Sequence, residues 1–469
     1  MNARVRELEL FPATVLATAA ILGVVAALQP LLAVAAAAGL VFAYVVFNDL
    51  AAGFAILALL SFLDTLPSSA SLSPSKAAGL LIAVAWLARY SSSAKGQRDL
   101  FGEHPFLTWV LIAFFSWSAL SLVWAPSTSI ALESLFRYAP NILLFPIAYT
   151  AIRTRRDVLL VLGAIVLGAI IAASFGVLQP PSAELGERAT GTVGDPNELA
   201  AFLLVGLALA AGFALGRGRS LLVRLVSIFT VALCAAAVFL SLSRGGLVAL
   251  GVLMLAGTVF AGKWRGALAV MLGLVAIGGV LYFTTLAPLP ARERITTANG
   301  GAGRSDIWKL GLRMVRAHPI DGVGVGNFPV VSPDYVLQPG TLERTDLVFS
   351  AAPKVTHNTY LEILSETGFP GFLLFAGAIL SCLACALKAA RVWGSQGQTD
   401  MEALARGLFL GLVGMLTADF FISEMYSKLL WVALALCPAL LAVARSERDE
   451  PQPATSPARR TERRRPVIV

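Results

Sequence analysis

The sequence predicts an all-α polytopic membrane protein with about 12 to 14 transmembrane helices. Apolar side chains make up 57% of the 469 residues and charged ones only 14%, whereas about a quarter of the residues in a soluble domain are charged. Apolar stretches of about 17 to 25 residues, long enough to cross about 30 Å of hydrocarbon, recur from Pro12 to Arg445 with short polar breaks. We therefore interpret residues 1–445 as a single transmembrane domain.

Fourteen apolar segments are expected as spans. In chain order they lie near 12–28, 30–47, 50–64, 76–90, 106–124, 138–152, 157–178, 197–215, 221–241, 244–262, 266–287, 359–387, 404–420 and 428–445. The first two are short, and a hairpin that does not fully cross would lower the count without changing the parity. Arg4 and Arg6 precede the first segment as in a signal peptide, but the apolar runs continue at once, so we expect an uncleaved span.

Lysine and arginine in the short loops predict the orientation, because they accumulate on the cytoplasmic side. Alternate breaks hold most of them, in the groups Arg89/Lys95/Arg98, Arg153/Arg155/Arg156, Arg217/Arg219/Arg224, Lys263/Arg265 and Lys388/Arg391/Arg406. Both termini are therefore expected in the cytoplasm, with residues 446–469 as a basic, disordered tail. The other breaks, including the large loop 288–358, are expected to face outward.

Cysteine and charge do not indicate a metal, a cofactor or a nucleic-acid partner. Cys234, Cys382, Cys385 and Cys437 all fall inside apolar spans, where cysteine behaves as a small hydrophobe. Much of the net charge of +8 lies in the tail, where arginines beside a membrane face anionic lipid. Since no outward cluster of carboxylates or histidines has the density of a metal site, we expect none.

Three outward loops end in helix-start signals. Asp195 is a typical N-cap before Pro196, and Ser243 can cap the next such span. Thr359 and Glu362 have the spacing of a capping box. The free amides and positive dipole ends of all three helices are expected to point outward.

A cationic or titratable side chain lies beside each start: Arg188, Arg244 and His357. Arg304 joins them from the long loop. Helix N-termini combined with arginine forks form phosphate sites. A helix dipole and nearby arginines favour the neutral imidazole that a general base needs, so His357 is the candidate base.

The long outward loop contains two further predicted elements. A helix over Ser305–Ala317 carries its apolar residues on one face and is expected to lie on the membrane surface, with its basic side toward anionic headgroups or a phosphorylated ligand. The stretch Gly322-Val-Gly-Val-Gly-Asn327 follows no strand, so we interpret it as a tight turn that folds the loop back on the spans.

At these residues the chain resembles a known superfamily. The pattern His357-Asn358, nine residues, then Gly368-Phe-Pro-Gly371 is similar to the signature of the O-antigen ligases, within the superfamily that also contains O-antigen polymerases and protein O-oligosaccharyltransferases. Similar stretches are Arg188–Gly191 with Asp195–Asn197, Ser241–Gly246, and Arg304 through Trp308 to Gly322–Asn327. The resemblance covers roughly residues 185–375.

The resemblance implies a membrane glycosyltransferase of the C-type (GT-C) fold in the bacterial inner membrane. It implies inverting, metal-independent transfer of O-antigen glycan from undecaprenyl diphosphate to lipid A core oligosaccharide, with the active site facing the periplasm. His357 is then the candidate base, and Arg244, Arg188 and Arg304 are the candidate diphosphate clamp. Asn358, Glu362 and Asn197 are possible supporting residues, and Asp64 at the outer end of the third predicted span is the rival base.

Two alternatives stay open from the residues. An O-antigen or exopolysaccharide polymerase needs the same lipid-linked donor and the same activated hydroxyl, so residue chemistry does not separate it from a ligase. A transporter of lipid-linked oligosaccharide is disfavoured, because transporters place ionisable groups near mid-membrane and the span centres here are almost free of charge.

Overall fold

The computed structural model describes residues 26–63, 74–92, 98–179, 188–287, 289, 292–293, 304–336, 338 and 355–449. Within these ranges every regular element is helical. Asp64, parts of the 288–358 loop and residues 450–469 of the tail lie outside them.

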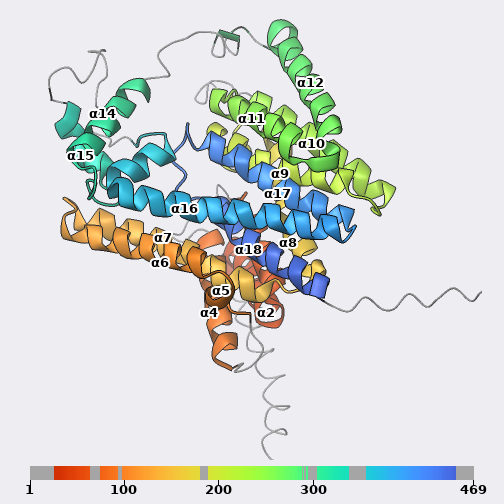
Figure 1. The fold of residues 1–469 in the computed structure, drawn as a ribbon, viewed down its shortest axis with the longest axis horizontal. Helices are drawn as coiled ribbons and strands as arrows, with labels where there is room; N and C mark the ends of the chain where they lie inside the picture. The colour runs from red at the N-terminus through yellow and green to blue at the C-terminus, as the bar shows by residue number, and fades with distance from the viewer. Residues whose placement is uncertain are drawn as a thin grey trace, which may run out of the picture.

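The helices follow the expected spans closely from residue 30 onward (Figure 1). Their bounds are α2 Pro30–Asn48, α3 Leu50–Leu60, α4 Pro74–Ser92, α5 Leu100–Glu103, α6 Pro105–Leu120, η1 Ser121–Val123, α7 Thr128–Ala151, α8 Arg155–Leu178, α9 Pro196–Leu215, α10 Leu221–Leu240, α11 Arg244–Phe260, η2 Gly262–Trp264, α12 Arg265–Leu281, the π-helix η3 Tyr282–Leu286, α14 Arg304–Ala317, α15 Phe328–Val336, α16 Thr359–Ser395, α17 Thr399–Ala418 and α18 Lys428–Asp449. Helix α7 begins well before residue 138, and α18 continues past residue 445 to Asp449.

The all-α polytopic fold class is confirmed. Eight helices of the described chain are long and apolar enough to cross a membrane, and Ala36–Asn48, Leu50–Leu60 and Arg244–Phe260 are shorter apolar helices. The count of 12 to 14 spans stays a prediction.

Helices α9, α17 and α18 form the centre of the bundle. Between 78% and 89% of their apolar segments are buried, against 28% for α10 and 12% for the segment containing α12, so the latter two lie at the periphery. Helices α9 and α17 touch through glycines: a Cβ on Gly212 would lie 2.9 Å from the Ala403 carbonyl oxygen, and one on Gly407 2.7 Å from that of Ala208. Small residues let two apolar helices approach this closely in a membrane.

The two alternating sets of loops lie at opposite ends of the bundle. At one end, basic residues of three different breaks form ion pairs with the start of α17. Arg155 and Arg219 both pair with Asp400, with Arg219 Nη2 at 3.1 Å, and Lys263 Nζ lies 2.8 Å from Glu402. The starts of α9, α11 and α16 belong to the other end. The compartment that each end faces stays a prediction from the positive-inside rule.

Helix α14 confirms the helix predicted at 305–317, but its apolar face is covered by protein. Ile307, Leu310 and Met314 are buried in a small core with residues of the following turn and of α15, and Gly311 abuts Leu361 of α16. Figure 1 shows α14 and α15 together beside the start of α16. The folded loop therefore buries this apolar face, and the expected position of the helix on the membrane surface, with its basic side toward headgroups or a phosphorylated ligand, stays a prediction.

Candidate functional site

The starts of α9 and α11 are tied together by one hydrogen-bond network. Arg188 donates from Nε to the Ser241 carbonyl oxygen and from Nη2 to Asn197 Oδ1, both at 2.9 Å. Ser243 Oγ lies 2.9 Å from the same amide oxygen and donates to it. The guanidinium of Arg188 is thereby fixed between the two helices.

Both N-caps predicted here are confirmed. Asp195 accepts hydrogen bonds from the amides of Asn197 at 2.6 Å and Glu198 at 3.1 Å, and Ser243 accepts one from Gly246 at 3.1 Å. Arg244 is the first residue of α11, and its side chain is exposed.

The two glycines after Arg244 allow neighbouring elements to approach. A Cβ on Gly245 would lie 2.6 Å from Phe421 Cβ, and one on Gly246 2.5 Å from Ala200 Cβ of α9. The two glycines therefore allow other parts of the protein to pack closely against the start of α11.

The segment that connects α17 to α18, residues 419–427, also holds the start of α16. The Thr359 amide donates to the carbonyl oxygens of Asp419 at 2.9 Å and Ile422 at 2.8 Å, and its hydroxyl accepts from the Glu424 amide at 2.8 Å. Since Phe421 of the same segment abuts Gly245, one short segment connects the neighbourhoods of Arg244 and His357. Our sequence analysis placed this loop outside but selected no residue from it.

The turn before α16 differs from the predicted capping box. The N-cap is Asn358, whose Oδ1 accepts from the amides of Tyr360 at 3.1 Å and Leu361 at 3.0 Å, because the Thr359 hydroxyl is engaged with the Ile422 carbonyl. The Glu362 carboxylate instead accepts from the amide and hydroxyl of Thr356, and from Ser423. Asn358 and Glu362 thus hold the backbone on both sides of His357.

His357 itself is exposed and has a left-handed backbone, with φ of 50°. The other non-glycine residue with positive φ in the described chain is Leu242, at 47°, two residues before Arg244. Such conformations cost about 1–3 kcal/mol and persist where surrounding contacts impose them, which is common at functional sites. One strained residue is therefore the predicted base itself, and the other lies two residues before Arg244.

Arg304 is brought toward the same turn by α14. It is the first residue of that helix, and Trp308, one turn later, donates from Nε1 to the Thr356 carbonyl oxygen at 3.2 Å. Residues four apart lie on one face of a helix, so Arg304 and Trp308 share the face that meets the His357 turn.

The glycine turn and the Gly368 motif are packed on each other, and the predicted fold-back turn is confirmed. The amides of Val323 and Gly324 donate to the carbonyl oxygens of Ser365 and Glu366, both at 2.9 Å. Gly368, with φ of 66° and ψ of −173°, breaks α16 after its first two turns and abuts the Ile320 carbonyl. The segment 359–387 is consequently two helices across a kink, where a continuous span was predicted.

Buried carboxyl groups beside these helix starts escaped our sequence analysis. Asp419 is fully buried, and neither of its carboxyl oxygens has a hydrogen-bond partner in the described chain. Burial, and next the hydrogen-bonded carboxyl of Glu198, raise the pKa of Glu424 well above its usual range. Two acidic residues in one short loop that is predicted to face outward were the available signal.

Comparison with known protein families supports the resemblance. Residues 229–376, less than half of the chain, match the family described as O-antigen ligase. The matched range contains Arg244, Arg304 and His357, whereas Arg188, Asn197 and the 419–427 segment lie outside it. No curated protein matches the chain.

Proposed function

We propose, from the match of residues 229–376 to the O-antigen ligase family, that this multi-pass membrane protein is an O-antigen ligase-type glycosyltransferase. It transfers O-antigen glycan from undecaprenyl diphosphate to lipid A core oligosaccharide at the periplasmic face of the bacterial inner membrane. The transfer inverts the anomeric carbon and needs no metal.

One observation carries the site assignment. Leu242, which has a left-handed backbone, lies two residues before Arg244, and the second left-handed residue is His357 itself. Both residues lie next to helix starts that the 419–427 segment contacts. Conformational strain at two separate points of one neighbourhood favours a functional site over a set of snorkelling arginines.

The proposed chemistry uses protein cations in place of a bound ion. The acceptor hydroxyl oxygen forms a bond to the anomeric carbon as the bond to the diphosphate breaks, and undecaprenyl diphosphate leaves with the electron pair. Arg244, Arg188 and Arg304, with the first-turn amides of α11, stabilise the charge on the diphosphate. His357 accepts the proton of the attacking hydroxyl.

The supporting residues act through the backbone. Asn197 holds Arg188 and Ser243, and so fixes the clamp. Asn358 and Glu362 fix the turn that presents His357. These are positioning residues, because their hydrogen bonds are made with the protein's own groups.

The test is a purified reaction with lipid-linked donor, lipid A core as the sole acceptor, and a chelator. A glycan-capped core supports the ligase. Lengthened lipid-linked glycan with untouched core would instead establish a polymerase, and a relocated but chemically unchanged donor would establish a transporter.

A further inference from the structure

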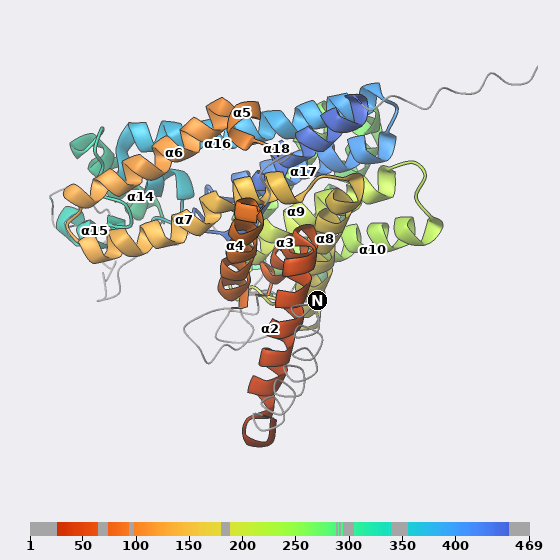
Figure 2. The same ribbon diagram turned by 90° about the horizontal axis from the view of Figure 1, so that it is seen from below.

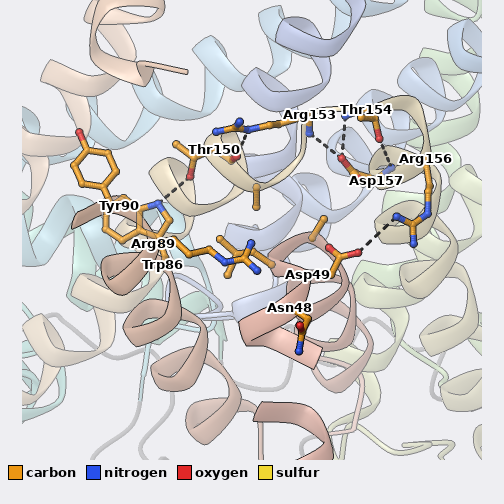
Figure 3. Close-up of a pocket in the computed structure, with 13 residues that line it drawn as sticks. Asn48, Asp49, Trp86, Arg89, Tyr90, Thr150, Arg153, Thr154, Arg156 and Asp157 are labelled. Atoms are coloured by element: carbon orange, nitrogen blue, oxygen red, sulfur yellow. Dashed lines mark hydrogen bonds and ion pairs between the residues drawn. The ribbon is translucent and has the colours of Figure 1, made fainter. Parts of the chain in front are cut away.

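A second polar site lies at the other end of the bundle. Helix α8 starts at Arg155 and ends at Leu178, next to Gln179, whose side chain accepts from the Thr190 and Gly191 amides of the Arg188 loop. At the start of α8, about 36 Å away along the helix, the α2–α3 junction, the end of α4 and the α7–α8 junction enclose a cleft of about 610 Å³ (Figure 3). This cleft is separate from the proposed transferase site.

Three arginines line the cleft: Arg89, Arg153 and Arg156. Arg153 donates from Nε to the Thr150 carbonyl oxygen at 2.8 Å, and its two Nη groups have no hydrogen-bond partner in the described chain. The Arg156 side chain is 77% exposed, and its Nη1 lies 3.6 Å from Asp49 Oδ2. Figure 3 shows the Arg89 guanidinium between Trp86 and Asp49. Arg89 donates from Nη2 to the Phe47 carbonyl oxygen at 2.7 Å, so the donors that remain for a ligand are the Nη groups of Arg153 and the largely exposed guanidinium of Arg156.

The two carboxylates of the cleft are already satisfied by backbone amides. Asp157 Oδ2 accepts from the amides of Arg153 at 3.0 Å and Thr154 at 2.9 Å, in the capping box of α8. Asp49 Oδ1 accepts from the Ala52 amide at 3.0 Å as the N-cap of α3. Helices α2, α4 and α7 end at the cleft where α3 and α8 begin, so the helix dipoles largely offset one another and the arginines supply the charge that favours an anion.

The rim of the cleft is apolar and aromatic on one side. Tyr44 and Phe47 of α2 and Leu87 and Tyr90 of α4 are all exposed, and Figure 2 shows α2 and α4 extending away from the layer of α6, α16 and α18. The rings of Trp86 and Tyr90 lie 5.3 Å apart. Tryptophan and tyrosine gather at headgroup level in membrane proteins, so this rim is suited to lipid acyl chains.

We propose that this cleft binds the phosphate headgroup of an anionic glycerophospholipid, whose acyl chains lie along the exposed faces of α2 and α4. Arginine guanidinium groups match the phosphodiester, and the apolar rim distinguishes a lipid-borne phosphate from a free one. The basic breaks of this end are expected on the cytoplasmic side, where anionic headgroups attract them.

The test titrates the full-length protein in neutral detergent with three probes: dioctanoyl phosphatidylglycerol, dioctanoyl phosphatidylcholine and glycerol 3-phosphate. The variant is Arg153→Gln with Arg156→Gln. Its matched control, Arg217→Gln with Arg265→Gln, removes two exposed charges at the same end but outside the cleft. Calorimetry measures affinity, and size-exclusion profiles verify folding.

We expect the protein and the control variant to bind phosphatidylglycerol in preference to the other two probes, and the cleft variant to bind it at least about tenfold more weakly. If the double variant fails to fold, Arg156→Gln alone is used, because that side chain is largely exposed, and about threefold weakening is expected. Unchanged affinity in the cleft variant, equal loss in the control, or equal binding of phosphatidylcholine would overturn the proposal. Glycerol 3-phosphate binding as tightly as the lipid would also overturn it, in favour of a soluble phosphate.

Discussion

Replacing His357 by asparagine separates the proposed catalytic role of this residue from its effect on stability. His357 has φ of 50°, and the left-handed region costs an ordinary L-residue about 1–2 kcal/mol. Asparagine adopts this region more readily, so the folded state should be unchanged or stabilised by up to about 1 kcal/mol. In contrast, asparagine cannot accept the proton of the acceptor hydroxyl.

The expected result is an inactive protein whose stability is equal to or slightly higher than that of the natural protein. Loss of general-base catalysis lowers a rate by about 10² to 10⁴-fold, so glycan transfer by His357→Asn should fall at least about a hundredfold. The apparent melting temperature should stay within about 1 °C or rise by about 2 °C. Single-turnover transfer from lipid-linked donor measures the first quantity, and thermal unfolding in detergent measures the second.

His318→Asn is the matched control. His318 follows α14 in the same outward loop, contacts Asp321 at 3.4 Å and does not have a left-handed backbone, so neither rate nor stability should change appreciably. If His357→Asn transfers glycan within a few-fold of the natural rate, His357 does not act as a general base. A melting temperature several degrees lower would refute the argument from backbone strain.

Three further perturbations test the remaining parts of the site. Arg244→Gln should lower the rate of glycan transfer by about 10² to 10³-fold without changing the melting temperature. Arg265 is also an exposed arginine at the start of an apolar helix, and Arg265→Gln should leave the rate unchanged in the same assay. Gly246→Ala should destabilise the protein by about 1–3 kcal/mol in thermal unfolding, because the new Cβ would meet Ala200 of α9. Gly251→Ala is the control: Gly251 lies on the same helix with open space around it, so this substitution should not destabilise the protein. The raised pKa of Glu424 means that its neutral form is favoured in the folded state, so its contribution to stability is full below about pH 4.5 and is lost as pH rises through the raised value. Glu424→Gln should therefore flatten the dependence of the melting temperature on pH, and a parallel pH profile in both proteins would count against a raised pKa.

The features that our sequence analysis predicted correctly are local ones. The N-caps at Asp195 and Ser243 follow from residue types within a few positions, since a side-chain oxygen there bonds amides two or three residues on. The glycine turn at 322–326 likewise follows from the need for positive φ. The match of residues 229–376 to the O-antigen ligase family then bore out the resemblance that was based on the pattern from His357 to Gly371.

The errors come from long-range competition for the same groups. Thr359 was predicted to cap α16, but its hydroxyl bonds Ile422 from the α17–α18 connection, and Asn358 caps the helix instead. The helix over 305–317 was predicted from its own periodicity, but the sequence did not predict that the glycine turn folds α15 and the first turns of α16 against its apolar face. Neither outcome is encoded within a few residues of the element concerned.

The sequence alone determined the membrane class, the helix positions and the alternation of basic and outward loops, because hydrophobic length and charge act on each segment separately. Tertiary structure alone decided that residues 419–427 connect the Arg244 and His357 neighbourhoods, that Arg188 is fixed by Asn197 and Ser241, and that the start of α16 is a separate short helix ended by Gly368. These contacts join residues far apart in the chain, and only close packing of the helices selects which of many possible partners meet.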